Sequence, residues 1–162
     1  MKPMILLMTA LLLVAACAGG TKRSDAQHND ADIAFARDMI AHHEQAVEMA
    51  ELVDDADASA DVTALAEQIA AAQGPEIERM NDWLDDWDAG EMSGSMDGGG
   101  HDAMPGMMSP ADLEALDRAT GAAFDQAWLT MMIAHHEGAV EMAATEAELG
   151  ENPGATALAE NI

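Results

Sequence analysis

Two pairs of adjacent histidines are the side chains of this sequence best suited to chemistry, and a methionine precedes each pair by three residues. The two sets are Met39 with His42 and His43, and Met132 with His135 and His136. Residues three and four apart share one face of a helix, so each set would gather two imidazoles and a thioether within about 6 Å of rise. Imidazole with thioether, without thiolate or carboxylate, favours copper, above all Cu(I), over Mg, Ca, Mn or iron.

Other interpretations of these histidines stay open. Zinc accepts imidazole but rarely takes methionine, whereas a di-iron bundle needs a Glu three residues before its His, where this chain has Met39 or Ile40. The pairs could also be core histidines bonded to backbone carbonyls, and gene duplication alone would preserve their spacing. Met49 and Met142 follow His42 and His135 by seven residues each. At that distance they would line a second layer beyond the candidate ligands or fill the core.

A second group of ligands lies in a Met/Gly-rich linker, residues 90–109. Such a composition is too rich in Gly and polar residues to pack, so packing does not account for its methionines. Thioethers on a flexible tether can wrap Cu(I) without deprotonation; alternatively, they could fold back onto an exposed apolar patch. The candidate ligands of the linker are Met92, Met96, His101, Met104, Met107 and Met108.

The histidine segments belong to an internal repeat. An offset of 93 positions aligns residues 35–50 with 128–143 without a gap, and the register persists to residues 158–160. Each unit has the pattern of a long helix, a short turn and a second helix. We therefore predict an all-α fold, a four-helix bundle of two helical hairpins, residues 32–89 and residues 110–162.

The first hairpin should contain helices over residues 33–53 and 61–87, with Asp61 as an N-cap and a kink at Gly74-Pro75. On the first of these helices the two histidines share the inward face with Met39 and small alanines, while the glutamates fall on the opposite face.

In the second hairpin, Ser109 and Pro110 predict a helix start, Gly121 a break before the main helix, and Gly150 its end. Ile162 aligns with Ile69. The counterpart of residues 70–87 is therefore absent, and we expect the last helix to be truncated and the second repeat incomplete.

The N-terminus is predicted to be a signal for export from the cytoplasm. Residues 1–17 combine Lys2, an apolar run and small residues before Cys17, as in a signal peptide. The stretch 13–17 resembles the lipobox of bacterial lipoproteins, in which the cysteine is lipidated; an ordinary cleaved signal is the alternative. Residues 18–31 would be a flexible segment. Either reading places the protein in the periplasm or on the outer cell surface, with a membrane contact only through a lipid anchor at Cys17.

Composition narrows the classes of partner. The 162 residues carry a formal charge of -25, which repels nucleic acid and anionic lipid surfaces. Apolar residues make up 49% but aromatic residues only 3%, which indicates a helical core of Ala, Leu and Met rather than a sheet.

The duplicated element Met-Ile-Ala-His-His-Glu-x-Ala-Val-Glu-Met-Ala resembles a bacterial exported family, a domain of unknown function in the ferritin-like superfamily. The resemblance covers residues 30–162 and implies a ferritin-like four-helix bundle. Members include a cyanobacterial periplasmic copper-resistance protein, so the resemblance also implies copper binding. By position, the family motif falls on the paired histidines with Met39, Met49, Met132 and Met142.

From these features we expect an exported copper-binding protein that sequesters or delivers copper at the cell envelope, and not an enzyme. Its partners would be copper ions, with an envelope copper-handling protein or a second copy of the chain as further candidates. Two alternatives are kept: a helical interaction module of the envelope that binds no metal, and a ferritin-like metal oxidase.

Overall fold

The computed structural model describes residues 27–89 and 104–162, and all its regular structure is helical. The elements are α1 (Asp30–Glu51), η1 (Leu52–Asp55), α2 (Ala60–Asp86), α3 (Pro110–Asp117), α4 (Gly121–Leu149) and α5 (Pro153–Ala159). The predicted all-α fold is confirmed. The predicted signal peptide with Cys17, most of the segment 18–31, and Met92, Met96 and His101 lie outside the described residues.

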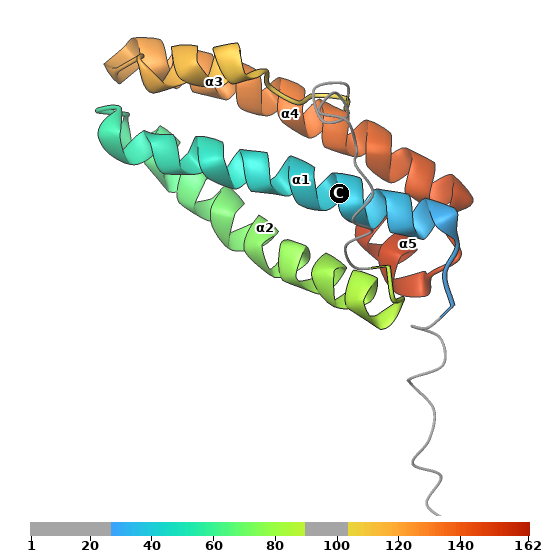
Figure 1. Cartoon of the computed structure of the whole chain (residues 1–162). Helices are drawn as coiled ribbons and strands as arrows, with labels where there is room; N and C mark the ends of the chain where they lie inside the picture. The colour runs from blue at the N-terminus through green and yellow to red at the C-terminus, as the bar shows by residue number, and fades with distance from the viewer. Residues whose placement is uncertain (1–26, 90–103) are drawn as a thin grey trace, which may run out of the picture.

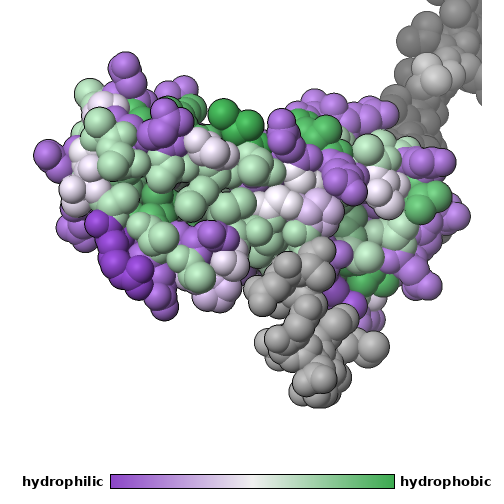
Figure 2. Space-filling model, turned by 90° about the horizontal axis from the view of Figure 1, so that it is seen from above, coloured by the Kyte–Doolittle hydropathy of each residue, from purple (hydrophilic) through white to green (hydrophobic). Residues whose placement is uncertain are grey.

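Three long helices make the body of the molecule. Helix α1 lies between α2 and α4 and runs opposite to both, while α3 lies along the start of α4 and α5 lies near the end of α2 (Figure 1). None of the helices in the described ranges combines the length and apolarity needed to span a bilayer. The face in Figure 2 shows apolar residues along its middle and hydrophilic residues around its margins.

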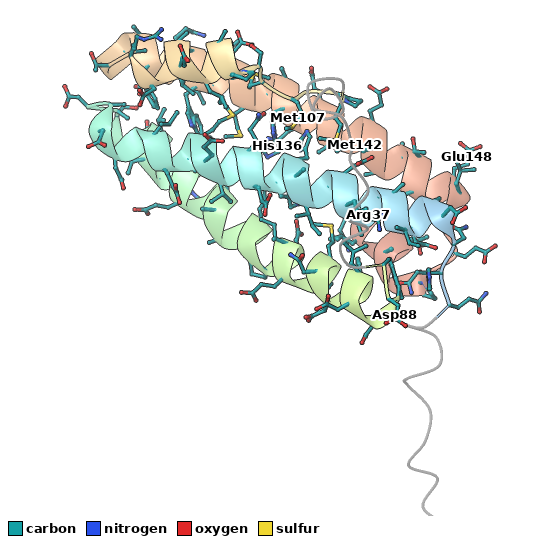
Figure 3. The ribbon with its side chains drawn as sticks, in the orientation of Figure 1. Arg37, Asp88, Met107, His136, Met142 and Glu148 are labelled. Atoms are coloured by element: carbon teal, nitrogen blue, oxygen red, sulfur yellow. The ribbon has the colours of Figure 1, made fainter. Side chains whose placement is uncertain are left out.

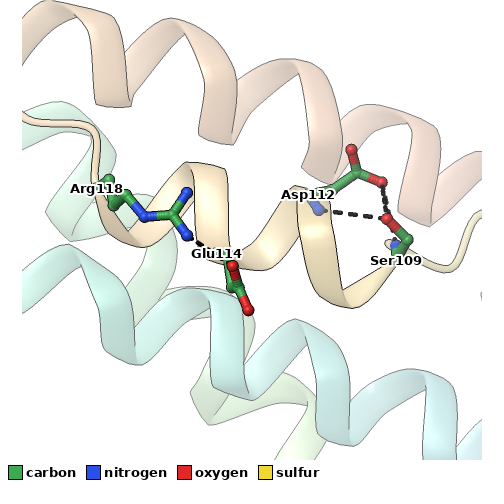
Figure 4. Close-up of polar contacts among 4 residues, drawn as sticks. All are labelled: Ser109, Asp112, Glu114 and Arg118. Atoms are coloured by element: carbon green, nitrogen blue, oxygen red, sulfur yellow. Dashed lines mark hydrogen bonds and ion pairs between the residues drawn. The ribbon is translucent and has the colours of Figure 1, made fainter.

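Local sequence signals set several helix boundaries. The Ser109 side chain accepts from the backbone N–H of Asp112 while Asp112 accepts in return, with Pro110 at the first turn (Figure 4). In the same helix Arg118 pairs with Glu114 one turn earlier (Figure 4). These caps explain why α3 begins where the sequence predicts.

One detail of the first hairpin differs from expectation. Helix α2 begins after Ser59, whose side chain accepts from the N–H of Val62, so Ser59 and not Asp61 is the N-cap. The helix runs through Pro75 to Asp86, which agrees with the predicted helix over residues 61–87. Proline removes one backbone donor there, and packing of the long helix against α1 outweighs that loss.

The apolar core falls into two clusters along the bundle. One centres on Phe35, Met80 and Leu84 near the start of α1, and the other on Met49 and Trp128 near its end. The Trp128 indole donates to the carbonyl of Met49 at 2.8 Å, which ties α4 to α1 inside the second cluster. The stretch of α1 between the clusters carries the first histidine pair.

A buried carboxyl pair joins the start of α1 to the turn between α4 and α5. Asp32 is fully buried and accepts from the backbone N–H groups of Asn29 at 2.7 Å, Asn152 at 2.8 Å and Glu151 at 3.2 Å. Burial opposes its charge, yet these hydrogen bonds hold the pKa of Asp32 below its usual value. Glu146 beside it is 1% exposed, and burial together with the Asp32 carboxylate raises the pKa of Glu146 to about 8.

The pH dependence of the free energy of unfolding tests the interaction between Asp32 and Glu146. Glu146 holds its proton up to about pH 8 when folded but only to about 4.5 when unfolded, so rising pH lowers the free energy of unfolding across that window. We expect Glu146→Gln to remove a fall on the order of 3 kcal/mol between pH 5 and 9, measured by urea unfolding. Glu148→Gln, at an exposed position one half-turn on, is the control and should keep the wild-type dependence. Equal dependence in wild type and Glu146→Gln would contradict the assignment.

Candidate metal centre

The buried face of α1 positions the first histidine pair. Helical spacing places Met39, His42, Ala46 and Met49 on one face, and each of the four is buried completely. Small Ala46, one turn beyond His42, leaves room for a ring on that face. The sequence pattern of α1 therefore forces an imidazole into the bundle interior.

His42 meets its repeat equivalent, His135 of α4, across the interface between the two helices. The ring centroids lie 3.7 Å apart with the planes tilted by 37°. Both residues are fully buried, and no nitrogen of either ring makes a hydrogen bond among the described residues. Four polar atoms without partners in a dry interior are costly, since most buried polar groups in proteins are bonded.

Burial keeps both rings neutral at physiological pH. Desolvation lowers the pKa of His42 to about 4, with a further contribution from the charge of His43, against which the nearby Pro105 carbonyl acts. Desolvation likewise lowers the pKa of His135 to about 3, helped by the neighbouring His42. Neutral imidazoles carry free lone pairs, the form in which histidine binds a metal.

The second histidine of each pair lies in a different environment from the first. His43 Nε2 contacts Glu76 Oε2 of α2 at 2.9 Å. Burial lowers the pKa of His43 more than the Glu76 carboxylate raises it. Sequence reasoning missed Glu76 because it sought carboxylates only at helical spacing, whereas the antiparallel register of the α1 and α2 hairpin brings this one opposite.

His136 is exposed and its Nδ1 lies 2.8 Å from the carbonyl of Met132 in the preceding turn. It lines an apolar groove of about 550 Å³ between α2 and α4, together with Leu65, Ile69 and Ile133. In the first repeat the same helical position is covered by α2. The structure thus brings together only the first histidine of each pair.

The predicted methionines occupy three kinds of place. Met39, Met132 and Met49 are buried within the apolar clusters, the first two each one turn before a centre histidine. Met142 is half-buried and shares a surface cavity of about 400 Å³ with Met104. Met108 packs on the second cluster. Met107 precedes α3, while His136 and Met142 lie on α4 (Figure 3) and line different surface cavities.

The ligand types limit which metal the centre can hold. Within residues 27–89 and 104–162, no three His, Cys, Asp or Glu side chains converge as a metal site. A zinc or di-iron centre of the usual kind needs such a group. What the described part of the chain offers is two neutral imidazoles with thioether sulfurs one turn away.

Comparisons with known proteins give the family. The chain matches the DUF305 family, a domain of unknown function, over residues 32–162. A DUF305 protein from Streptomyces coelicolor, described as secreted, is 34% identical, with 85% of this chain and 82% of that chain covered and a TM-score of 0.71. A DUF305 fragment from Deinococcus radiodurans is 27% identical, with 82% and 85% covered and a TM-score of 0.71. None of the curated proteins matches. The chain therefore belongs to the DUF305 family.

Proposed function

We propose that this protein binds copper at the cell envelope, with His42 and His135 as the central ligands. The observation that carries the proposal is the contact between two fully buried, neutral imidazoles whose nitrogens make no hydrogen bond within residues 27–89 and 104–162. Coordination of a cation by these nitrogens would compensate for their lost hydration.

The thioethers around the pair favour copper over other cations. Met39 and Met132 stand one turn before His42 and His135, so each helix can supply one nitrogen and one sulfur. Soft thioether with imidazole suits Cu(I), and neither donor has to lose a proton at neutral pH. In this proposal the buried centre holds the ion, and the linker methionines with His101 capture it from solution.

The proposal describes a binding protein and not an enzyme. Export from the cytoplasm would place it where copper arrives, and the predicted signal peptide and the secreted Streptomyces relative support export. Lipid attachment at Cys17 and transfer of copper to an envelope partner are further parts of the proposal. Ferritin-like oxidase chemistry is the less favoured alternative, because such sites use carboxylates with histidine and no three His, Cys, Asp or Glu side chains converge within residues 27–89 and 104–162.

A specific observation favours a second candidate function. The groove beside His136 exposes large apolar side chains, with Ile133 61% and Val140 53% exposed. Exposed apolar surface of this kind commonly marks a contact with another protein. A helical interaction module would use this groove, and its binding would not change when copper is chelated.

Single substitutions separate the centre from the other histidines. We expect His42→Ala or His135→Ala to weaken Cu(I) binding by at least about 100-fold, because each removes one of two nitrogen ligands. Competition with bicinchoninate under anaerobic conditions measures the affinity. His136→Ala is the matched control, since it removes the adjacent but exposed ring. Retention of wild-type affinity in both centre variants would exclude the proposed site.

The pH dependence of copper binding gives a separate test. Protons compete for an imidazole only near and below its pKa, which is about 4 for His42 and about 3 for His135. Cu(I) affinity of the centre should therefore stay constant from pH 7 to 5 and fall below about pH 4, as followed by equilibrium dialysis. A site built from exposed histidines would already weaken between pH 7 and 5, and that result would contradict the assignment.

A further inference from the structure

The five residues Met104–Met108 lie against α4 at Gly138 and against α1 at Gln45, three residues after each histidine of the buried pair. They come just before α3 and lie on the side of the molecule formed by α1 and α4 (Figure 1). At Gly106 their backbone lies against the carbonyls of Ala134 and His135 in α4. We call this segment the strap.

Gln45 of α1 holds one end of the strap. Its side-chain Nε2 donates to the Met108 carbonyl at 2.9 Å, and its Oε1 accepts from the Met108 N–H at 2.7 Å. Gln45 is 8% exposed, so both bonds are shielded from water. A single amide thus satisfies both backbone groups of one strap residue, as a neighbouring strand would.

Gly138 of α4 receives the other end. A Cβ at position 138 would collide with the carbonyl of Pro105 and would lie 2.6 Å from the backbone nitrogen of Gly106. Gly106 has a φ of +77°, and a Cβ there would lie 2.8 Å from the His135 carbonyl. Glycine at both positions lets two backbones touch.

Gln45 and Gly138 are the same position of the two repeats, three residues after His42 and His135 respectively. The repeats therefore differ at a position where each contacts the strap. One copy carries an amide that binds the strap, and the other has no side chain, so that the strap can approach. A segment that covers the pair from one side requires such a difference between the two repeats, whereas a symmetric bundle does not.

We infer that the strap is a cover for the His42–His135 pair, held shut by Gln45 and Gly138, and that its detachment gives a cation access to the pair. The inference rests on the proposed function for the nature of the cation. Gln45 and Gly138 are positioning residues, because they act through the strap and not as ligands. Met104 and Met108 stand at its two ends, where thioethers can meet an incoming soft cation.

The first experiment uses the metal-free protein and measures how fast diethyl pyrocarbonate modifies each histidine, read by peptide mass spectrometry. We expect Gln45→Ala and Gly138→Ala to raise the rates at His42 and His135 about tenfold, since local opening limits access to a buried ring. The rate at exposed His136 should stay constant in every variant and serves as an internal reference. Gln45→Glu keeps one acceptor for the Met108 N–H and should give an intermediate rate.

The controls match each substitution. Gln68→Ala removes a helical glutamine whose amide bonds only to its own helix, and Gly74→Ala adds a methyl group to a helical glycine with open space around it. In both control variants, diethyl pyrocarbonate should modify His42 and His135 at the wild-type rates. Circular dichroism verifies that every variant is folded. Unchanged rates in folded Gln45→Ala or Gly138→Ala would overturn the inference.

A second arm separates this inference from the proposed function. Cu(I) transfer from the protein to excess bicinchoninate should be about tenfold faster in Gln45→Ala and Gly138→Ala than in the controls. If the wild type binds no Cu(I) but the histidine modification rates change as expected, the proposed function is wrong and the inference about the strap is kept. If Cu(I) binds and both the modification and the transfer rates of the variants match the wild type, the inference about the strap is wrong and the copper site is kept.

Discussion

The contact between His42 and His135 in the buried interior governs how the bundle around it is built. Two imidazoles without hydrogen-bond partners are unfavourable in an apolar core, and the fold holds them there by large clusters on either side along α1. Met39 and Phe35 anchor one cluster and Met49 the other. The centre is therefore stabilised by its surroundings and not by its own bonds, as is typical of a site preorganised for a ligand.

Duplication explains why the centre is symmetric. The differences between the two repeats explain how a cation could reach it. Each repeat supplies one ring to the pair, so the pair lies where the two hairpins meet. The second histidines show what surrounds each copy: His43 is enclosed by α2 and contacts Glu76, whereas His136 faces an open groove. The difference between Gln45 and Gly138 accommodates the strap, because Gln45 binds its backbone and Gly138 lets it approach α4 closely.

Much of the fold could be predicted from local signals, because caps and periodicity act within one or two turns. Ser109 with Pro110 marked a helix start, and repeated apolar spacing placed His42 on an inward face. The contacts with Glu76 and Gln45 could not be read in that way, since they depend on the register between distant elements. Residues 39–50 and 132–143 are identical except at Gln45 and Gly138, and this difference was the visible clue to the strap.

X-ray absorption spectroscopy of the protein loaded with one equivalent of Cu(I) shows which atoms bind the metal. We expect a mixed shell of imidazole nitrogen and thioether sulfur in the wild type, with the imidazole scattering reduced in His135→Ala and unchanged in His136→Ala. A shell of sulfur alone, or one whose imidazole scattering is the same in wild type and His135→Ala, would show that copper binds elsewhere and would contradict the account.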